Sequence, residues 1–169
     1  MTERETAIVV RIRVPAPIER LRRAHDRSAA LGVPAHVTIL YPFVPRAELT
    51  EAEPRLAELV AGHEAFDATF ARTARFPDLL YLEPQPAERF LRLTEAVTAA
   101  WPEHPPYEGA HEVVIPHLTV AESEDASLLD AIASEVELRL PIRERVDAAS
   151  LFVESDDGRW QEHSRLPLG

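Results

Sequence analysis

Hydrophobic and polar positions change their spacing several times along the chain, and each change predicts a new element of secondary structure. Runs of apolar and β-branched residues bounded by turn-forming residues predict strands, at 7–15, 35–44, 66–76, 79–84 and 113–123. Apolar residues three and four positions apart predict helices, at 18–31, 47–63, 87–101 and 125–140. The last part of the chain, 144–168, predicts two strands joined by a Ser-Asp-Asp-Gly turn. Strands and helices therefore alternate along the chain.

The order of these predicted elements repeats. PAPIERL at 15–21 matches PQPAERF at 84–90, where two prolines, a glutamate and an arginine coincide at an offset of 84 − 15 = 69. Each copy follows a predicted strand and opens a predicted helix, and a strand with the pattern His-x-Thr comes after each helix. The two histidines, His36 and His117, are 117 − 36 = 81 positions apart, so 81 − 69 = 12 extra residues fit a longer loop in the second half. The pattern indicates a duplicated fold.

Two predicted strands carry a histidine and a threonine on one face. In VPAHVTIL and VIPHLTVA, His36 shares a face with Thr38, and His117 with Thr119, because side chains two apart on a strand point the same way. If the halves pack about a pseudo-twofold axis, the four side chains meet in a polar cleft. Two facing imidazoles supply a base and an acid near pH 7, and the hydroxyls can donate to phosphoryl oxygens. The arrangement points to in-line displacement at a phosphodiester.

Composition restricts the chemistry further. The chain of 169 residues has no cysteine, and all 18 of its basic side chains are arginine. Disulfides, thiolate catalysis, cysteine-bound metals, a Walker A loop and lysine adenylylation are therefore excluded. The net charge is −11, and no basic run is visible. Any nucleic-acid partner is therefore expected to be a single nucleotide or a short piece, held by a few arginines, and not a long duplex.

The longest apolar runs are too short to span a bilayer, and the N-terminal MTERET lacks the apolar core of a signal peptide. We therefore expect a cytoplasmic protein without a membrane partner. We also expect it to be a monomer.

Two other roles for the histidines stay open at this point. A histidine on an apolar strand can be a core residue bonded to the backbone, in which case the repeat is purely structural. His36 and His117 can also bind a metal, but no carboxylate or third histidine stands at ligand spacing beside either motif. His111 is the nearest candidate and is expected on the loop surface. We expect neither a metal nor a cofactor.

On these motifs the chain resembles the two-histidine (2H) phosphoesterase superfamily, which includes bacterial enzymes named 2′-5′ RNA ligases or RNA 2′,3′-cyclic phosphodiesterases. The resemblance covers nearly the whole chain. It includes the opening strand–proline–helix, HVTILYPF, the RFP segment at 75–77, HLTV and the closing hairpin.

The resemblance implies an α+β fold in which two antiparallel sheets line a central cleft and helices lie outside. We expect one domain, 1–169, with pseudo-twofold lobes at about 1–78 and 79–169 and with strand exchange between them. The resemblance further implies a catalytic quartet, made of His36, Thr38, His117 and Thr119.

The resemblance also implies a reaction. The usual substrates of the 2H superfamily are 2′,3′-cyclic phosphates, which are opened to 2′-phosphates, and 2′-5′ linkages. Ligation driven by ATP is not expected without a lysine, so any ligation is the reversal of cyclic phosphate opening. The alternative is a nucleotide- or RNA-binding module on the same scaffold without turnover. The sequence does not show which histidine is the general acid and which the general base. It also does not show which nucleobase the substrate carries.

Three further side chains are candidates for contacting the substrate. Arg11 and Arg13 alternate with apolar residues on the first strand, where they either hold a phosphate or form a solvated face. Tyr81 corresponds to Ile12 through the repeat, and it either stacks on a base or packs in the core. Tyr107, in the proline-rich loop before the second motif, is a candidate for part of a lid.

Overall fold

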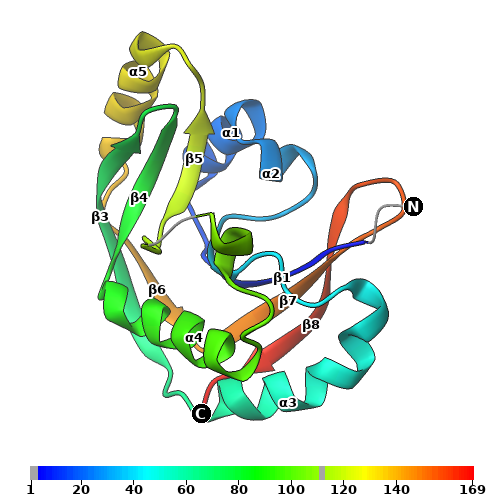
Figure 1. Ribbon diagram of the computed structural model, residues 1–169. Coiled ribbons are helices and arrows are strands. Elements are labelled where there is room, and N and C mark those ends of the chain that lie inside the picture. The colour runs from blue at the N-terminus through cyan, green and yellow to red at the C-terminus, as the bar shows by residue number, and fades with distance from the viewer. Residues whose placement is uncertain (1–3, 111–112) are drawn as a thin grey trace.

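A computed structural model of the chain describes residues 4–110 and 113–169, within which eight strands form two sheets surrounded by helices (Figure 1). The strands are β1 (Thr6–Arg11), β2 (His36–Leu40), β3 (Phe66–Phe76), β4 (Leu79–Gln85), β5 (Leu118–Glu122), β6 (Ile142–Val146), β7 (Ala148–Glu154) and β8 (Trp160–Pro167). The α-helices are α1 (Ala16–His25), α2 (Arg27–Ala30), α3 (Leu49–Ala61), α4 (Ala87–Ala100) and α5 (Ala126–Glu137). Two short 3₁₀-helices are η1 (Arg46–Glu48) and η2 (Pro106–Gly109).

The two sheets have equivalent strand orders. The first sheet runs β2-β1-β7-β8 and the second β5-β4-β3-β6, and every neighbouring pair is antiparallel. The edge strand β2 carries His36 and pairs with β1, which opens the first repeat. The edge strand β5 directly follows His117 and pairs with β4, which opens the second repeat. The predicted α+β fold with two antiparallel sheets is confirmed. Each sheet combines strands from both sides of residue 78, and the predicted lobe boundary itself stays a prediction.

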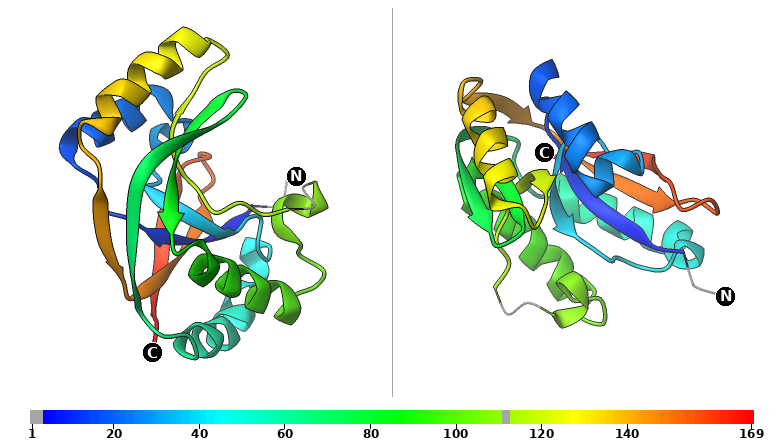
Figure 2. Two further views of the ribbon diagram at one scale, coloured as in Figure 1. Left: turned by 90° about the vertical axis from the view of Figure 1, so that its left-hand side faces the viewer. Right: turned by 90° about the horizontal axis from the view of Figure 1, so that it is seen from above.

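The two repeats pack across one another. Helix α1 of the first repeat packs against β5, and α4 of the second packs against β2. Figures 1 and 2 show the helices at the periphery of the two sheets. Thr94 of α4 donates from its hydroxyl to the carbonyl of Ile39 in β2, at 2.7 Å. The backbone N–H of Arg27 donates to the Glu122 carboxylate at the end of β5, at 3.2 Å. Neither repeat therefore completes its packing alone.

Several predicted elements differ from the structure. The strand predicted at 113–123 begins only at Leu118, so His117 directly precedes β5 and does not lie on it. The helix predicted at 18–31 is divided at Asp26, whose carboxylate accepts from the N–H of Ser28 at 3.1 Å and caps the separate helix α2. The two strands predicted near the C-terminus are three. The chain leaves the second sheet at Val146 and enters the first at Ala148. A stretch that looks like one strand in the sequence is thus divided between two sheets. The spacing of apolar residues cannot show this change of sheet.

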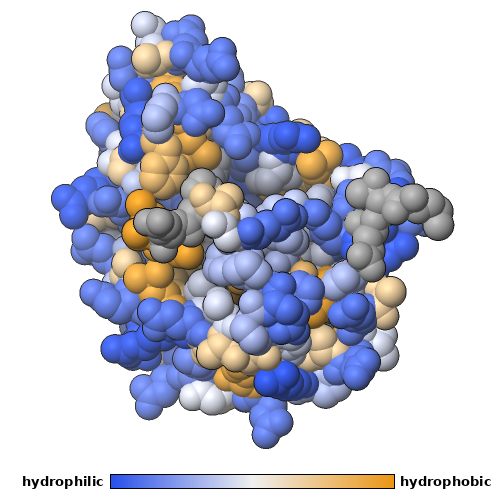
Figure 3. All heavy atoms as spheres, viewed as in Figure 1, coloured by the Kyte–Doolittle hydropathy of each residue, from blue (hydrophilic) through white to orange (hydrophobic). Residues whose placement is uncertain are grey.

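Most buried apolar residues of both sheets and of the helices form one continuous core, and a smaller second cluster contains Ala7, Val9 and Phe152. Phe70 of β3, Phe90 of α4 and Leu118 of β5 are each at most 1% exposed and belong to the same cluster. The face seen in Figure 3 is predominantly hydrophilic, with apolar residues in small groups. Among the described residues, no helix combines the length and apolarity that a membrane crossing requires.

Substitution of one leucine in this core and of one on the surface tests the packing. Leu93 of α4 is 1% exposed, whereas Leu138, after α5, is 77% exposed. We expect Leu93→Ala to lower the free energy of unfolding in urea by about 2–5 kcal/mol, because it leaves a cavity. The matched change Leu138→Ala should lower it by less than about 0.5 kcal/mol. Equal losses in the two variants would contradict this description of the core.

Candidate active site

Two edge strands bring the motif residues toward each other. Strands β2 and β5 lie against one another at the meeting of the two sheets. His36 and Thr38 are half-buried, while Val37 between them is fully buried. His117 and Thr119 alternate with buried residues in the same manner. All four motif side chains therefore point away from the core, three of them on the adjoining strands and His117 directly before β5.

Each histidine ring is held by its own chain. Nδ1 of His36 lies 2.7 Å from the carbonyl oxygen of Pro34, and Nδ1 of His117 lies 2.6 Å from that of Ile115. A carbonyl oxygen only accepts hydrogen bonds, so Nδ1 carries the proton and donates it in both rings. The lone pair of the neutral ring is then on Nε2. Both rings have the same tautomer, and Nε2 is the atom that can exchange a proton.

The surroundings of His36 favour its neutral form. Burial is the main cause, and it lowers the pKa of His36 to about 4. The guanidinium of Arg22 and the imidazole of His117 lower this pKa as well, whereas the hydrogen bond to Pro34 and the carboxylate of Asp26 raise it. The ring keeps some contact with solvent, but protein surrounds it on most sides. At neutral pH His36 is therefore an uncharged imidazole.

A buried arginine supports the segment that leads into β2. Arg22 is completely buried and donates to the carboxylates of Asp26 and Glu19, both at 3.0 Å. It also donates to the carbonyl of Val33 at 3.2 Å. Arg22 belongs to no motif of the sequence, but its spacing of four from the buried Ile18 places it on the inner side of α1.

His117 has aromatic neighbours. Its ring meets the ring of Phe76 edge to face, with centroids 5.4 Å apart, and the ring of Tyr81 at 5.6 Å. Phe76 and Tyr81 contact each other at 4.6 Å. Tyr81 is only 6% exposed, so it forms part of the wall that orients His117. Its proposed stacking on a base stays a prediction.

The register of the strands corrects the equivalence of Tyr81 and Ile12 that the sequence repeat predicted. Tyr81 pairs with Thr119 across β4 and β5, and Val9 pairs with Thr38 across β1 and β2. Tyr81 is therefore the structural equivalent of Val9, and not of Ile12. Each strand pair shifts its register next to this position, and such a bulge changes the alignment between the halves.

The two candidate arginines lie in different places. Arg11 is the cross-strand partner of His36 and therefore lies on the same face, with its guanidinium 3.2 Å from the Glu162 carboxylate. Arg13 lies beyond the end of β1 and makes three hydrogen bonds of 2.9–3.2 Å to Glu144 in the second sheet. Arg11 is beside the histidine, whereas Arg13 ties the two sheets together. Their roles in substrate binding stay predictions.

Tyr107 of η2 reaches the first motif. Its backbone N–H donates to the carbonyl of Tyr41 at 2.7 Å, just after β2 ends. Burial raises the pKa of its phenol, and the nearby hydroxyl of Thr38 lowers it. The loop residue therefore lies next to the end of the first motif strand. His111 is outside the described residues. Within the described ranges, no group of three or more histidines and carboxylates is arranged to hold a metal ion.

Two hollows are lined by residues that come shortly before the motif histidines in the chain. One of about 370 Å³ is lined partly by Pro34 and Arg11, and one of about 860 Å³ partly by Ile115, Pro116 and Arg72. Pro34 and Ile115 are the residues whose carbonyls hold the two rings, but neither histidine lines a hollow. Both volumes are in the range of about 300–1,000 Å³ that small-molecule sites occupy.

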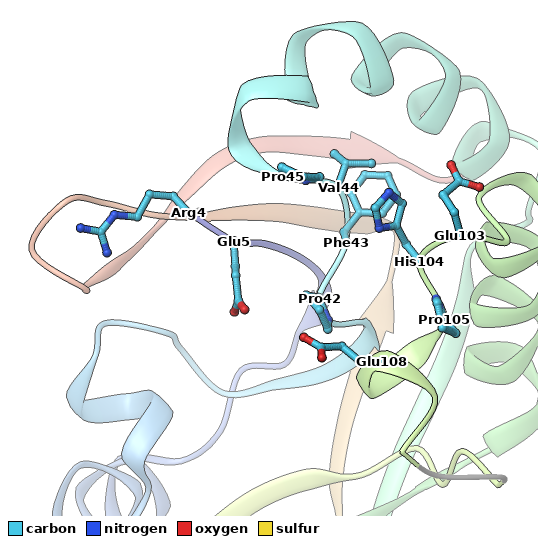
Figure 4. Close-up of a pocket in the computed structure, with 10 residues that line it drawn as sticks. All are labelled: Arg4, Glu5, Pro42, Phe43, Val44, Pro45, Glu103, His104, Pro105 and Glu108. Carbon is cyan, nitrogen blue, oxygen red and sulfur yellow. The ribbon is translucent and has the colours of Figure 1, made fainter. Parts of the chain in front are cut away.

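A third hollow, of about 600 Å³, lies beside the loop that follows β2 (Figure 4). Glu5 and Glu108 extend toward one another there, and Glu103 also lines it. Three carboxylates disfavour an anion, so this hollow is a poor place for a phosphate.

The low pKa of His36 makes stability depend on pH. Between about pH 6.5 and 4 the unfolded chain binds a proton that the folded chain does not, so stability falls as the pH is lowered through this range. We expect this group to contribute a loss of up to about 3 kcal/mol, and His36→Asn to remove it. Urea unfolding at several pH values measures the loss, and the NMR titration of His36 should show a midpoint near 4. Identical pH dependence in the two proteins would contradict the assignment.

Comparisons with solved structures show the same fold in other proteins. TT0787 of Thermus thermophilus has a TM-score of 0.63 at 19% identity, over 96% of this chain and 97% of its own. E. coli LigT complexed with 3′-AMP has a TM-score of 0.62 at 17% identity, over 99% of each chain. Usb1 of Kluyveromyces marxianus has 0.54 at 13%, over 96% and 97%. These structures show the shared fold.

Sequence comparisons identify the family. No curated protein matches the chain significantly in sequence. The family model described as the 2′-5′ RNA ligase superfamily matches residues 10–158, which is most of the chain. The predicted resemblance is confirmed: this chain belongs to the 2′-5′ RNA ligase superfamily of two-histidine phosphoesterases.

Proposed function

We propose that the chain is a metal-independent phosphodiesterase that opens ribose 2′,3′-cyclic phosphates to 2′-phosphates. The observation that carries the proposal is the pair of histidines at adjoining strands, each held through Nδ1 and each two residues from a threonine. Family membership supports phosphoesterase chemistry. Structures of E. coli LigT complexed with 3′-AMP and with ATP support a nucleotide as the ligand. Cleavage or formation of 2′-5′ linkages by the same groups belongs to the same proposal.

In the proposed reaction the phosphorus atom lies between the two rings. Nε2 of one histidine takes a proton from water as the water oxygen bonds to phosphorus. Nε2 of the other gives a proton to the 3′ oxygen as the bond from phosphorus to that oxygen breaks. Thr38 and Thr119 donate to the non-bridging oxygens, where charge develops in the transition state. The chain thus supplies an acid, a base and two donors from its own side chains.

The charges around the site favour a short substrate. The net charge of −11 repels an extended polyanion. The arginines nearest the hollows are paired with carboxylates, Arg11 with Glu162 at 3.2 Å and Arg72 with Glu83 at 2.9 Å. A monomeric state and a cytoplasmic location stay predictions.

Turnover of 2′,3′-cyclic nucleotides in EDTA tests the proposal, with 2′- and 3′-phosphate products resolved by chromatography. We expect formation of the 2′-phosphate, and we expect His36→Ala and His117→Ala each to lower kcat by about a hundredfold or more. The matched control is His163→Ala, which removes a histidine on β8 that is paired with Glu53. Circular dichroism and urea unfolding confirm that each variant is folded.

The other outcomes separate the alternatives. Activity lost in EDTA would indicate a metal-dependent enzyme, and nucleotide binding without turnover would indicate a binding module. Histidine variants that lose stability while keeping activity would indicate a structural repeat. A substrate with sulfur in place of the 3′ oxygen assigns the roles, because a thiolate leaves without a proton. The variant that lacks the acid should regain activity on this substrate, and the variant that lacks the base should not.

A further inference from the structure

One buried side chain reaches the segment that leads into the first motif strand. Arg22 of α1 is fully buried, and its guanidinium donates to the carbonyl of Val33 at 3.2 Å. The next residue is Pro34, whose carbonyl oxygen lies 2.7 Å from Nδ1 of His36. Arg22 therefore holds the peptide unit next to the one that orients the histidine ring.

The carbonyl of Pro34 has little freedom once its neighbours are fixed. A peptide unit is planar, so the hydrogen bond from Arg22 to the carbonyl of Val33 restrains the whole plane between Val33 and Pro34. The pyrrolidine ring fixes φ of Pro34. On the other side, the carbonyl of Ala35 accepts from the N–H of Ile12 at 2.9 Å. The acceptor of the histidine proton therefore lies between two anchored peptide units, and Arg22 is the side chain that anchors the first of them.

Two carboxylates hold the guanidinium in place. Arg22 donates to Asp26, which is 4% exposed, and to Glu19, both at 3.0 Å. Its buried Nε has no hydrogen-bond partner among the described residues. Apolar residues of similar volume often stabilise a fold as well as a buried ion pair does, and an unsatisfied buried donor costs free energy. Stability alone is therefore a weak reason for an arginine at this position, whereas the bond to Val33 is a specific one.

We propose that Arg22 is a positioning residue that fixes the tautomer and the direction of the His36 ring through the carbonyls of Val33 and Pro34. This inference rests on the proposed function, since Arg22 affects turnover only if His36 exchanges a proton at Nε2. With the Pro34 carbonyl in place, Nδ1 keeps its proton and the lone pair of Nε2 has one direction. When that carbonyl is free to turn, Nδ1 loses its acceptor and both tautomers become populated.

Removal of the arginine without a charge left behind tests the proposal. Arg22→Met alone would leave the carboxylate of Asp26 buried without its partner, so Arg22→Met/Asp26→Asn is compared with Asp26→Asn. Asparagine still caps α2, and Glu19 keeps a second partner in Arg23, at 3.6 Å. On a 2′,3′-cyclic nucleotide we expect the double variant to have a kcat about tenfold lower than that of Asp26→Asn, because the reacting nitrogen is misplaced. Its KM should stay within about twofold, because contacts with the substrate are kept.

The ¹⁵N NMR signals of the His36 ring near neutral pH are a second readout, which requires no turnover. In the unsubstituted chain and in Asp26→Asn, we expect Nδ1 to have the signal of a protonated nitrogen and Nε2 that of an unprotonated one. In the double variant both signals should move toward intermediate values, because two tautomers exchange. Leu56→Ala, at a fully buried position of α3, is the control for lost stability and should keep the signals of the unsubstituted chain.

Unchanged His36 signals in the folded double variant, or a kcat equal to that of Asp26→Asn, would overturn the positioning role. The same change of signals in Leu56→Ala would also overturn it, because general loosening would then explain the effect. Circular dichroism at the assay temperature shows that each variant is folded. Shifted signals in the double variant of a chain that has no turnover refute the phosphodiesterase alone. Turnover with unchanged signals refutes the positioning role alone.

Discussion

The approach of β2 and β5 at the edges of two separate sheets is the constraint on which the rest of the structure depends. Each of these strands is covered by the helix of the other repeat, α4 on β2 and α1 on β5. The core is continuous across both sheets, so separating the strands would expose apolar surface from both halves. The core therefore holds the two strands in place, although all four motif side chains point away from it.

Duplication produces two rings with the same local geometry in different surroundings. Each histidine donates from Nδ1 to the carbonyl two residues before it. Beyond that bond, His36 lies near the buried ion pair of Arg22, whereas His117 is packed edge to face against Phe76 and Tyr81. In the proposed reaction one ring gives a proton while the other takes one. Unequal surroundings favour a different protonation of the two rings, so they suit the proposed division of roles.

The distribution of charge also suits a small ligand. The chain is strongly acidic overall, and the arginines that border the motifs are paired with carboxylates. An anion that approaches Arg11 competes with Glu162 for the guanidinium, so binding there involves an exchange of partners. A broad basic surface would attract any nucleic acid, whereas paired arginines favour a ligand held by a few specific contacts.

The sequence alone predicted most of the secondary structure, because the periods of strands and helices are local properties. The sequence-based prediction was wrong where the structure depends on pairing between strands, because the spacing of apolar residues does not encode that pairing. The break between Val146 and Ala148 marks a change of sheet, and the bulge beside Tyr81 shifts the correspondence between the halves.

The same division holds at the site. Spacing by itself determined that His36 shares a face with Thr38, and His117 with Thr119, because side chains alternate along a strand. Only the tertiary structure decided which residues surround them. Arg22, Phe76 and Tyr107 reach the motifs from a helix, a strand end and a loop that no sequence period relates to either histidine. Packing across the two sheets brings them there, and packing depends on side-chain volume and on the path of the whole chain.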